Sequence, residues 1–115
     1  MSIELKRVYE DHGQTAGYRV LVDRLWPRGI AKADLPYDEW LRDLAPSTAL
    51  RKQFGHDPAR WDAFRSAYLA ELKAQAATLA RLRAIARKQH LVLLYGAKDE
   101  EHNQAVVLRD VLQKG

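Results

Sequence analysis

The stretch LVLLYG at residues 91–96 decides the fold, because it is a continuous apolar run that a glycine ends. Such runs are typical of strands that are buried on both faces of a sheet. Residues 3–9 (IELKRVY) alternate roughly between apolar and polar, and residues 18–23 (YRVLVD) are rich in β-formers, with a turn at 10–17 between them. Both segments therefore predict further strands.

Loop and helix signals occupy the middle of the chain. Residues 24–36 (RLWPRGIAKADLP) contain two prolines and a glycine, which predict a loop. Residues 37–44 (YDEWLRDL) predict a short helix that Pro46 ends. Ser47 is positioned to cap the next helical segment, STALRKQF. An aspartate before a proline, as in Asp57-Pro58, is a strong start signal for the helix that follows.

The second half of the chain completes an α/β pattern. Apolar residues recur at helical spacing in two successive helices, at Trp61, Phe64, Tyr68 and Leu72 and then at Leu79, Leu82 and Ile85. A last helix is predicted to open at Asp99, since acidic residues suit the positive end of the helix dipole. We therefore predict one α/β domain over residues 1–115, with a small central, partly parallel sheet covered by helices.

Composition narrows the function classes. The 115 residues are 47% hydrophobic and 30% charged, as in ordinary globular proteins. The absence of cysteine excludes disulfides and thiolate chemistry and favours a reducing, cytoplasmic location. The N-terminal segment has no apolar run typical of a signal peptide, and the run at 91–95 is too short to span a bilayer. We expect no membrane partner.

The basic residues are unevenly distributed. The formal net charge is +4, and no acidic residue lies between Glu71 and Asp99. A basic stretch at 73–98 is compatible with a nucleic-acid-associated module, although the solvated face of a helix is the simpler explanation. The basic residues of this stretch are Lys73, Arg81, Arg83, Arg87, Lys88 and Lys98.

Two strand-to-helix junctions concentrate polar side chains, in segments 23–29 (DRLWPRG) and 95–103 (YGAKDEEHN). Ligands of open α/β sheets bind beyond the carboxyl ends of the strands, so the two segments form one site if their strands are parallel neighbours. Anion-binding groups would then be Arg24, Arg28 and Lys98. The alternative for the two arginines is structural pairing with Asp23, Asp34 or Asp43.

The second junction supplies the candidate catalytic residue. His102 is a natural general acid or base because its unperturbed pKa is near neutrality. Asn103 would orient a ligand, or would instead tie down the turn. Three acidic residues at 99–101 oppose a phosphate there and suit a cation better, yet no spacing typical of metal ligands is present. We expect no metal site, and the sequence indicates no particular cofactor.

Two further sets of candidates remain, one on a predicted helix and one within the first junction. Ser47 and Arg51 stand one helical turn apart and together could bind an anion, although two caps at a helix corner are the simpler explanation. Trp26 is a candidate pocket wall with a stacking role. No glycine-rich phosphate loop or nucleophile elbow is present.

The segments RVLVDRLWPRGIAK, WLRDLAPSTALRKQFGHDPARWDAF and LLYGAKDEEHNQAVVL resemble the bacterial domain-of-unknown-function 488 family, in its short YeaO-like branch. The resemblance covers residues 7–112 and implies an α/β fold without an established activity. Other branches carry a Cys-His-Arg cluster after the corresponding strand, where this chain has Glu101, His102 and Asn103. Cysteine-dependent chemistry is therefore not expected here.

Three functions remain open from the sequence. The first is a protein, enzymatic or not, with a pocket at the carboxyl ends of the strands for an anionic small molecule such as a nucleotide or phosphorylated metabolite. The second is a nucleic-acid-associated module that uses residues 73–98. The third is an interaction protein without catalysis, which internal salt bridges filling the sheet edge would favour.

Overall fold

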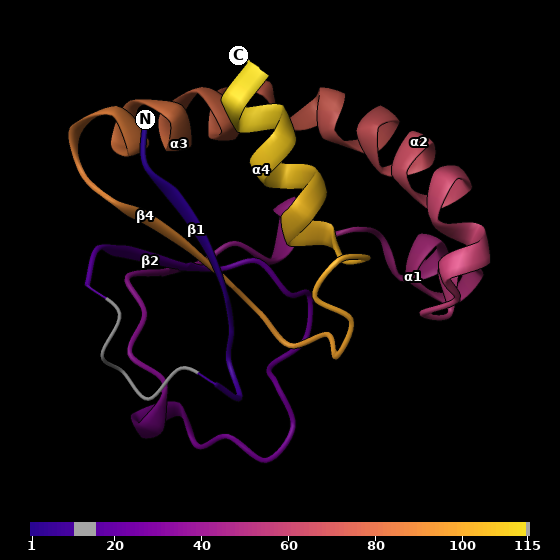
Figure 1. The fold of residues 1–115 in the computed structure, drawn as a ribbon, viewed down its shortest axis with the longest axis horizontal. Helices are drawn as coiled ribbons and strands as arrows, with labels where there is room; N and C mark the ends of the chain where they lie inside the picture. The colour runs from indigo at the N-terminus through magenta and orange to yellow at the C-terminus, as the bar shows by residue number, and fades with distance from the viewer. Residues whose placement is uncertain (11–15, 115) are drawn as a thin grey trace.

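The computed structural model describes residues 1–10 and 16–114. It contains a four-stranded sheet in the order β1-β4-β2-β3 (Figure 1). The strands are β1 (Ile3–Arg7), β2 (Tyr18–Leu21), β3 (Glu39–Trp40) and β4 (Leu91–Tyr95). The pairings β1–β4, β4–β2 and β2–β3 are all parallel. The α/β class is therefore confirmed, whereas the turn predicted at 10–17 lies largely outside the described residues.

The strand β4 is the centre of the molecule. All five of its residues are buried, because β1 and β2 flank it and apolar side chains cover both of its faces. Leu91 and Leu93 pack with the helices, whereas Val92 and Leu94 pack against the other face. The continuous apolar pattern follows from this position, since neither face of the strand meets water.

Different structures cover the two faces of the sheet. The helices α1 (Thr48–Phe54), α2 (Trp61–Leu72), α3 (Ala76–Lys88) and α4 (Gln104–Lys114) form one core with the first face. The other face is covered by the irregular segment that follows β2, through Trp26, Ile30 and Leu35 (Figure 1). None of the described helices is long and apolar enough to cross a membrane.

The helix predicted at 37–44 is wrong. This segment instead forms the two-residue strand β3 and a short 3₁₀ helix, Arg42–Leu44. The Leu41 N–H donates to the carbonyl of Leu21, and the Trp40 indole N–H donates to the carbonyl of Asp23 at 2.7 Å. A segment this short has few internal helical bonds, so pairing with the edge of β2 determines its conformation.

The last helix begins five residues later than predicted. Asp99 does not open α4, because its Oδ1 accepts hydrogen bonds from the N–H groups of Glu101 and His102 and closes a separate turn. Asn103 caps α4 instead, with its side-chain oxygen accepting from the N–H groups of Ala105 and Val106. His102 and Asn103 therefore precede the helix rather than occupy its first turn.

Two predicted caps are confirmed. The Ser47 hydroxyl accepts a hydrogen bond from the Leu50 N–H at the start of α1. The Asp57 carboxylate accepts from the Ala59 N–H at 3.0 Å. Proline at the next position starts a 3₁₀ turn, Pro58–Arg60, which continues directly into α2. These caps fix the corner between α1 and α2 that borders the site.

Candidate functional site

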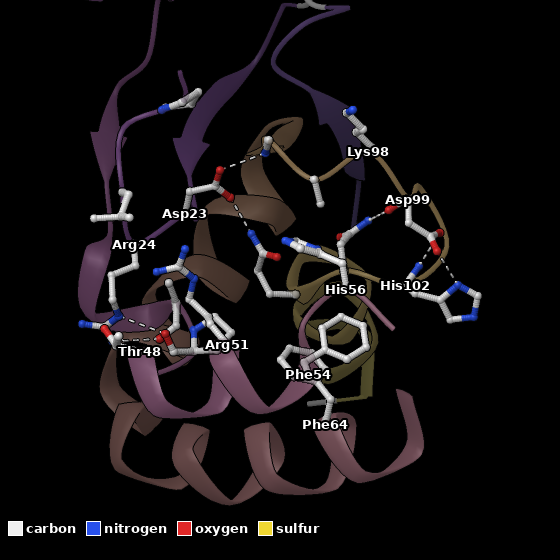
Figure 2. Close-up of a pocket in the computed structure, with 18 of the residues that line it drawn as sticks. Asp23, Arg24, Thr48, Arg51, Phe54, His56, Phe64, Lys98, Asp99 and His102 are labelled. Atoms are coloured by element: carbon white, nitrogen blue, oxygen red, sulfur yellow. Dashed lines mark hydrogen bonds and ion pairs between the residues drawn. The ribbon is translucent and has the colours of Figure 1, made fainter. Parts of the chain in front are cut away.

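A single pocket joins the two junctions. Because β2 and β4 are parallel neighbours, the segments that follow them leave the sheet at the same edge. Together with α1 and the start of α4 they enclose a cavity of about 900 Å³ (Figure 2). This volume lies within the range of small-molecule sites in proteins.

Most of the residues singled out from the sequence line this pocket. Those that do so are Arg24, Trp26, Arg28, Arg51, Lys98, His102 and Asn103. Ser47 is the exception. Its hydroxyl caps α1 and donates to the Glu71 carboxylate at 2.6 Å, and its N–H donates to the same carboxylate. Helix capping, the alternative explanation of Ser47, describes this arrangement, and an anion site formed by Ser47 with Arg51 stays a prediction.

Arg24 has a structural task. Its Nε donates to the carbonyl of Pro46 at 2.9 Å, and a terminal nitrogen donates to the carbonyl of Ala45 at 3.1 Å. Arg24 therefore has a structural role, as the alternative proposed, but its partners are these two carbonyls and not an aspartate. The guanidinium thus fastens the loop after β2 to the segment before α1, and it builds the pocket wall.

Three other cations line the pocket without a partner. Among the residues that the structure describes, none forms a hydrogen bond or ion pair with the side-chain nitrogens of Arg28, Arg51 or Lys98. All three residues are exposed. The backbone of Arg28 is nevertheless held, because the Tyr9 hydroxyl donates to its carbonyl at 2.8 Å. These side chains are available to an anionic ligand.

Trp26 packs against the apolar cluster on the sheet face opposite the helices and is not a free stacking platform. Its indole N–H donates to the carbonyl of Ile30 at 2.6 Å. Its ring contacts Trp40 edge-on, with the ring centroids 5.4 Å apart, and lies 5.7 Å from the ring of Tyr37. The predicted role as a pocket wall fits these contacts.

The second junction is a tight turn around Asp99. The carboxylate accepts two backbone N–H bonds and pairs with His102 Nδ1 at 2.9 Å. These hydrogen bonds, that of Glu101 first, lower the pKa of Asp99. The His102 ring also packs edge-on against Trp61, with centroids 5.3 Å apart. In Figure 2 it lies beyond Asp99, away from Asp23 and Arg51.

Asn103 is buried and serves the turn. It is 2% exposed, its Nδ2 donates to the carbonyl of Asp99 at 2.9 Å, and its Oδ1 caps α4. This arrangement matches the alternative in which Asn103 holds the turn together. Its amide is not exposed to a ligand, as the predicted ligand-orienting role would need.

Asp23 is the principal site residue that the sequence did not single out. Its Oδ2 accepts the Gly96 N–H at 2.9 Å, and its Oδ1 accepts Gln104 Nε2 at 2.5 Å. Burial raises its pKa to about 6, although these hydrogen bonds and the charge of Arg51 oppose the rise. A perturbed carboxyl in a cleft is a marker of functional sites. The available signal was an acidic residue directly after an apolar strand.

His56 was also missed as a pocket residue. It lines the cavity, and its backbone is left-handed, with φ of 55°, directly after Gly55 with the same φ. Histidine tolerates this region better than most residues do. The ring lies beside Phe54, with centroids 6.2 Å apart, and above Phe54 and Phe64 in Figure 2. The Gly-His pair after the helix was the sequence signal.

Comparison with known proteins gives the following relatives. A family model described as "Inactive DUF488-N3 subclade" matches residues 2–115. The chain is 51% identical over 113 residues to the uncharacterised protein YeaO of Escherichia coli, covering 98% of both chains. It is 40% identical over 110 residues to the uncharacterised protein Rv3073c of Mycobacterium tuberculosis, covering 96% of this chain and 92% of the relative. No solved structure matches the chain.

Proposed function

Because this chain belongs to the DUF488 family, in the subclade described as inactive, we propose that it binds a small anionic molecule and does not transform it. The observation that carries the proposal is the group of three cations, Arg28, Arg51 and Lys98, that have no partner among the described residues and line one cavity of about 900 Å³. Exposed cations in a concave wall concentrate positive potential where a ligand can enter.

The charge balance of the pocket favours an anion. Its lining contains five basic side chains, Arg24, Arg28, Arg51, Lys52 and Lys98, but only two acidic ones, Asp23 and Asp99. Asp99 is already engaged with His102 and two backbone N–H groups. Guanidinium groups bind phosphate and carboxylate through paired hydrogen bonds, so these are the anions we expect.

The apolar part of the pocket indicates a ligand larger than a bare ion. Phe54 and Phe64 stack with their centroids 4.4 Å apart and both line the cavity. A wall of this kind suits an aromatic or sugar ring attached to the anionic group. A nucleotide or a phosphorylated metabolite combines both features, and we propose this class, acting in the cytoplasm.

His102 belongs to the wall in this proposal. Its Nδ1 is held by Asp99 and its ring by Trp61. Proton transfer by His102 would add an enzymatic step, which the description of the subclade does not favour. We therefore assign the residue to the shape of the pocket.

The basic stretch at 73–98 does not support the nucleic-acid alternative. Arg81 forms two hydrogen bonds with Glu39, at 2.6 and 2.8 Å. Arg83 donates to carbonyls at the end of α4, and Lys98 lines the pocket. Of the remaining exposed cations, Lys73 lies before α3, and Arg87 and Lys88 lie at its C-terminal end. The interaction-protein alternative is not supported either, since among the described residues that line the cavity only His102 and Asp99 form an ion pair with each other.

Isothermal titration calorimetry of the full chain with AMP, ribose 5-phosphate and sulfate tests the proposal. We expect saturable binding of at least one probe at about 1 mM or tighter. Arg51→Ala should weaken it about tenfold or more, since hydrogen bonds to charged groups contribute about 1.5–3 kcal/mol. Lys88→Ala is the matched control, because Lys88 ends α3 just before β4 begins, at the opposite edge of the sheet.

The proposal is wrong if none of the three probes binds the wild-type chain. It is equally wrong if Arg51→Ala and Lys88→Ala bind every probe as the wild type does.

A further inference from the structure

Asp23 is a pocket residue that anion binding alone does not explain. The residue follows β2 and accepts hydrogen bonds from the Gly96 N–H, which follows β4, and from the Gln104 side chain, which begins α4. Figure 2 shows these two bonds and the Arg51 side chain extending from α1 toward the same carboxylate. Three chain segments thus hold a negative group inside a predominantly basic pocket.

The fold makes specific room for this carboxylate. A Cβ atom at position 96 would lie 2.8 Å from Asp23 Oδ2, which is closer than real Cβ atoms approach an oxygen. Glycine at 96 therefore allows the backbone N–H to reach the carboxylate. The position is built around the acid and is not an incidental contact between surface residues.

The structural role of Asp23 does not require its charge. A neutral asparagine would accept the same hydrogen bond from Gly96, and Gln104 could turn its amide to accept from the asparagine. An ionised carboxylate also incurs a desolvation penalty when it is buried. The hydrogen bonds of Gly96 and Gln104 and the charge of Arg51 offset only part of this penalty, so a further donor from a ligand would stabilise the carboxylate.

The carboxylate has unused acceptor capacity that faces a ligand. A carboxylate has about four lone-pair positions, and the described donors occupy one on each oxygen. Because Asp23 lines the cavity, a bound molecule can donate to those that remain. A bare anion cannot donate and would meet only repulsion from Asp23.

We propose that Asp23 determines specificity by selecting anions that also carry an N–H or O–H donor and by rejecting bare anions. The anionic group of the ligand lies toward Arg28, Arg51 and Lys98, and the donor lies on the Asp23 carboxylate. This assignment rests on the proposed function, and it narrows the ligand class to molecules such as nucleoside or sugar phosphates.

Calorimetry at pH 7.5 with sulfate as the bare anion, and with AMP and ribose 5-phosphate as donor-bearing anions, tests this selection. The wild type should bind at least one donor-bearing probe more tightly than sulfate. Asp23→Asn should weaken that probe about tenfold or more, as expected for loss of a charged hydrogen bond, while sulfate binding stays unchanged or improves. Glu101→Gln is the matched control, because it removes one exposed acidic charge from the neighbouring segment after β4 without touching the pocket lining.

The opposite movement of the two probe types separates selection from a structural defect. A structural defect in Asp23→Asn would weaken sulfate and the donor-bearing probes together, and that result overturns the inference. So does unchanged binding of all probes in Asp23→Asn, or sulfate binding as tight as both donor-bearing probes in the wild type. In these cases anion binding by the pocket still stands, whereas failure of every probe to bind the wild type removes both proposals.

Discussion

The pocket cations and the cations of α3 have the same charge but opposite tasks. Arg28, Arg51 and Lys98 line a cavity without a described partner. On α3, Arg81 is bonded to Glu39 and Arg83 to the carbonyl groups that end α4. The pocket cations make no described contact that stabilises the fold, whereas Arg81 and Arg83 connect α3 to other elements.

This difference shows that a run of charge along the sequence does not by itself locate a binding surface. The basic stretch at 73–98 was the more conspicuous signal, yet part of it is consumed by internal contacts. Side chains that bind a ligand are better recognised by their lack of hydrogen bonds and ion pairs within the protein. Such groups are expected to be neutral or unfavourable for stability.

The largest expected effect is on anion binding, and it comes from removing the pocket cations while leaving the cations of α3 in place. Replacing the three pocket cations Arg28, Arg51 and Lys98 by alanine should weaken anion binding about 100-fold or more, because several charge-assisted bonds are lost together. Titration of AMP and sulfate measures the change. The matched triple variant replaces Lys73, Arg87 and Lys88, which are exposed, and should bind within about twofold of wild type. Equal losses in both triples would show that overall charge, not the pocket, attracts the anion.

Asp23→Asn tests whether the site is maintained at the expense of stability. The folded-state pKa of Asp23 is about 6, above the ordinary aspartate value of 3.8 that applies to the unfolded chain. Between these values the folded state binds more protons than the unfolded state, so this group stabilises the wild type as pH falls.

The asparagine variant should therefore be more stable than wild type at pH 7.5, by on the order of 2 kcal/mol. The advantage should shrink as pH falls through 6 and approach zero only below about pH 3, where the carboxyl is protonated in both states of the wild type. Urea unfolding at pH 7.5, 5.5 and 4 measures it. A variant that is less stable at pH 7.5 would show that the charge supports the fold.

Arg83→Ala should lower the stability of the fold, in contrast to Asp23→Asn. The guanidinium donates to the carbonyls of Val111 and Leu112, at 3.0 and 3.3 Å, where a cation also interacts favourably with the helix dipole. Its loss should lower the free energy of unfolding by about 1–2 kcal/mol. Arg87→Ala, which removes an exposed cation from the same helix, should change the urea midpoint little. Equal midpoints in the two variants would contradict the fastening role.

Arg81→Ala should produce the smallest change. The ion pair with Glu39 is well aligned, but the two side chains are 45% and 22% exposed, so solvent screens it. We expect a loss of about 0.5 kcal/mol that decreases as salt is added. A double-mutant cycle with Glu39→Gln in low and high salt measures the coupling. A coupling that salt leaves unchanged would contradict screening by solvent.

The fold was predictable where one segment carried its own pattern. The run 91–96 identified the buried strand, and Ser47 and Asp57 identified two helix starts. Prediction failed at 37–44, where the strand exists only because Leu21 offers a free edge. It also failed at Asp99, whose carboxylate bonds to the backbone ahead of α4 and delays that helix.

The site was predictable only conditionally. That two polar junctions share a pocket depends on β2 lying beside β4, which no local pattern in the sequence specifies. The missed residues have the same cause. Asp23 is held at the pocket by the Gly96 N–H from the neighbouring strand, whereas in the sequence alone an aspartate beside an arginine predicts an ion pair. The roles proposed for Arg28, Arg51, Lys98 and His102 stay predictions.

The central position of β4 has a consequence for biosynthesis. The strand that joins the sheet is made last: until residue 95 leaves the ribosome, β1 has no described neighbour and β2 has only the two-residue β3. Most of the chain is therefore synthesised before β4, and until then the edges of β1 and β2 that pair with β4 stay unpaired. We expect nascent chains that stop before β4 to depend on chaperones, and the native sheet to form in one cooperative step once that strand is inserted.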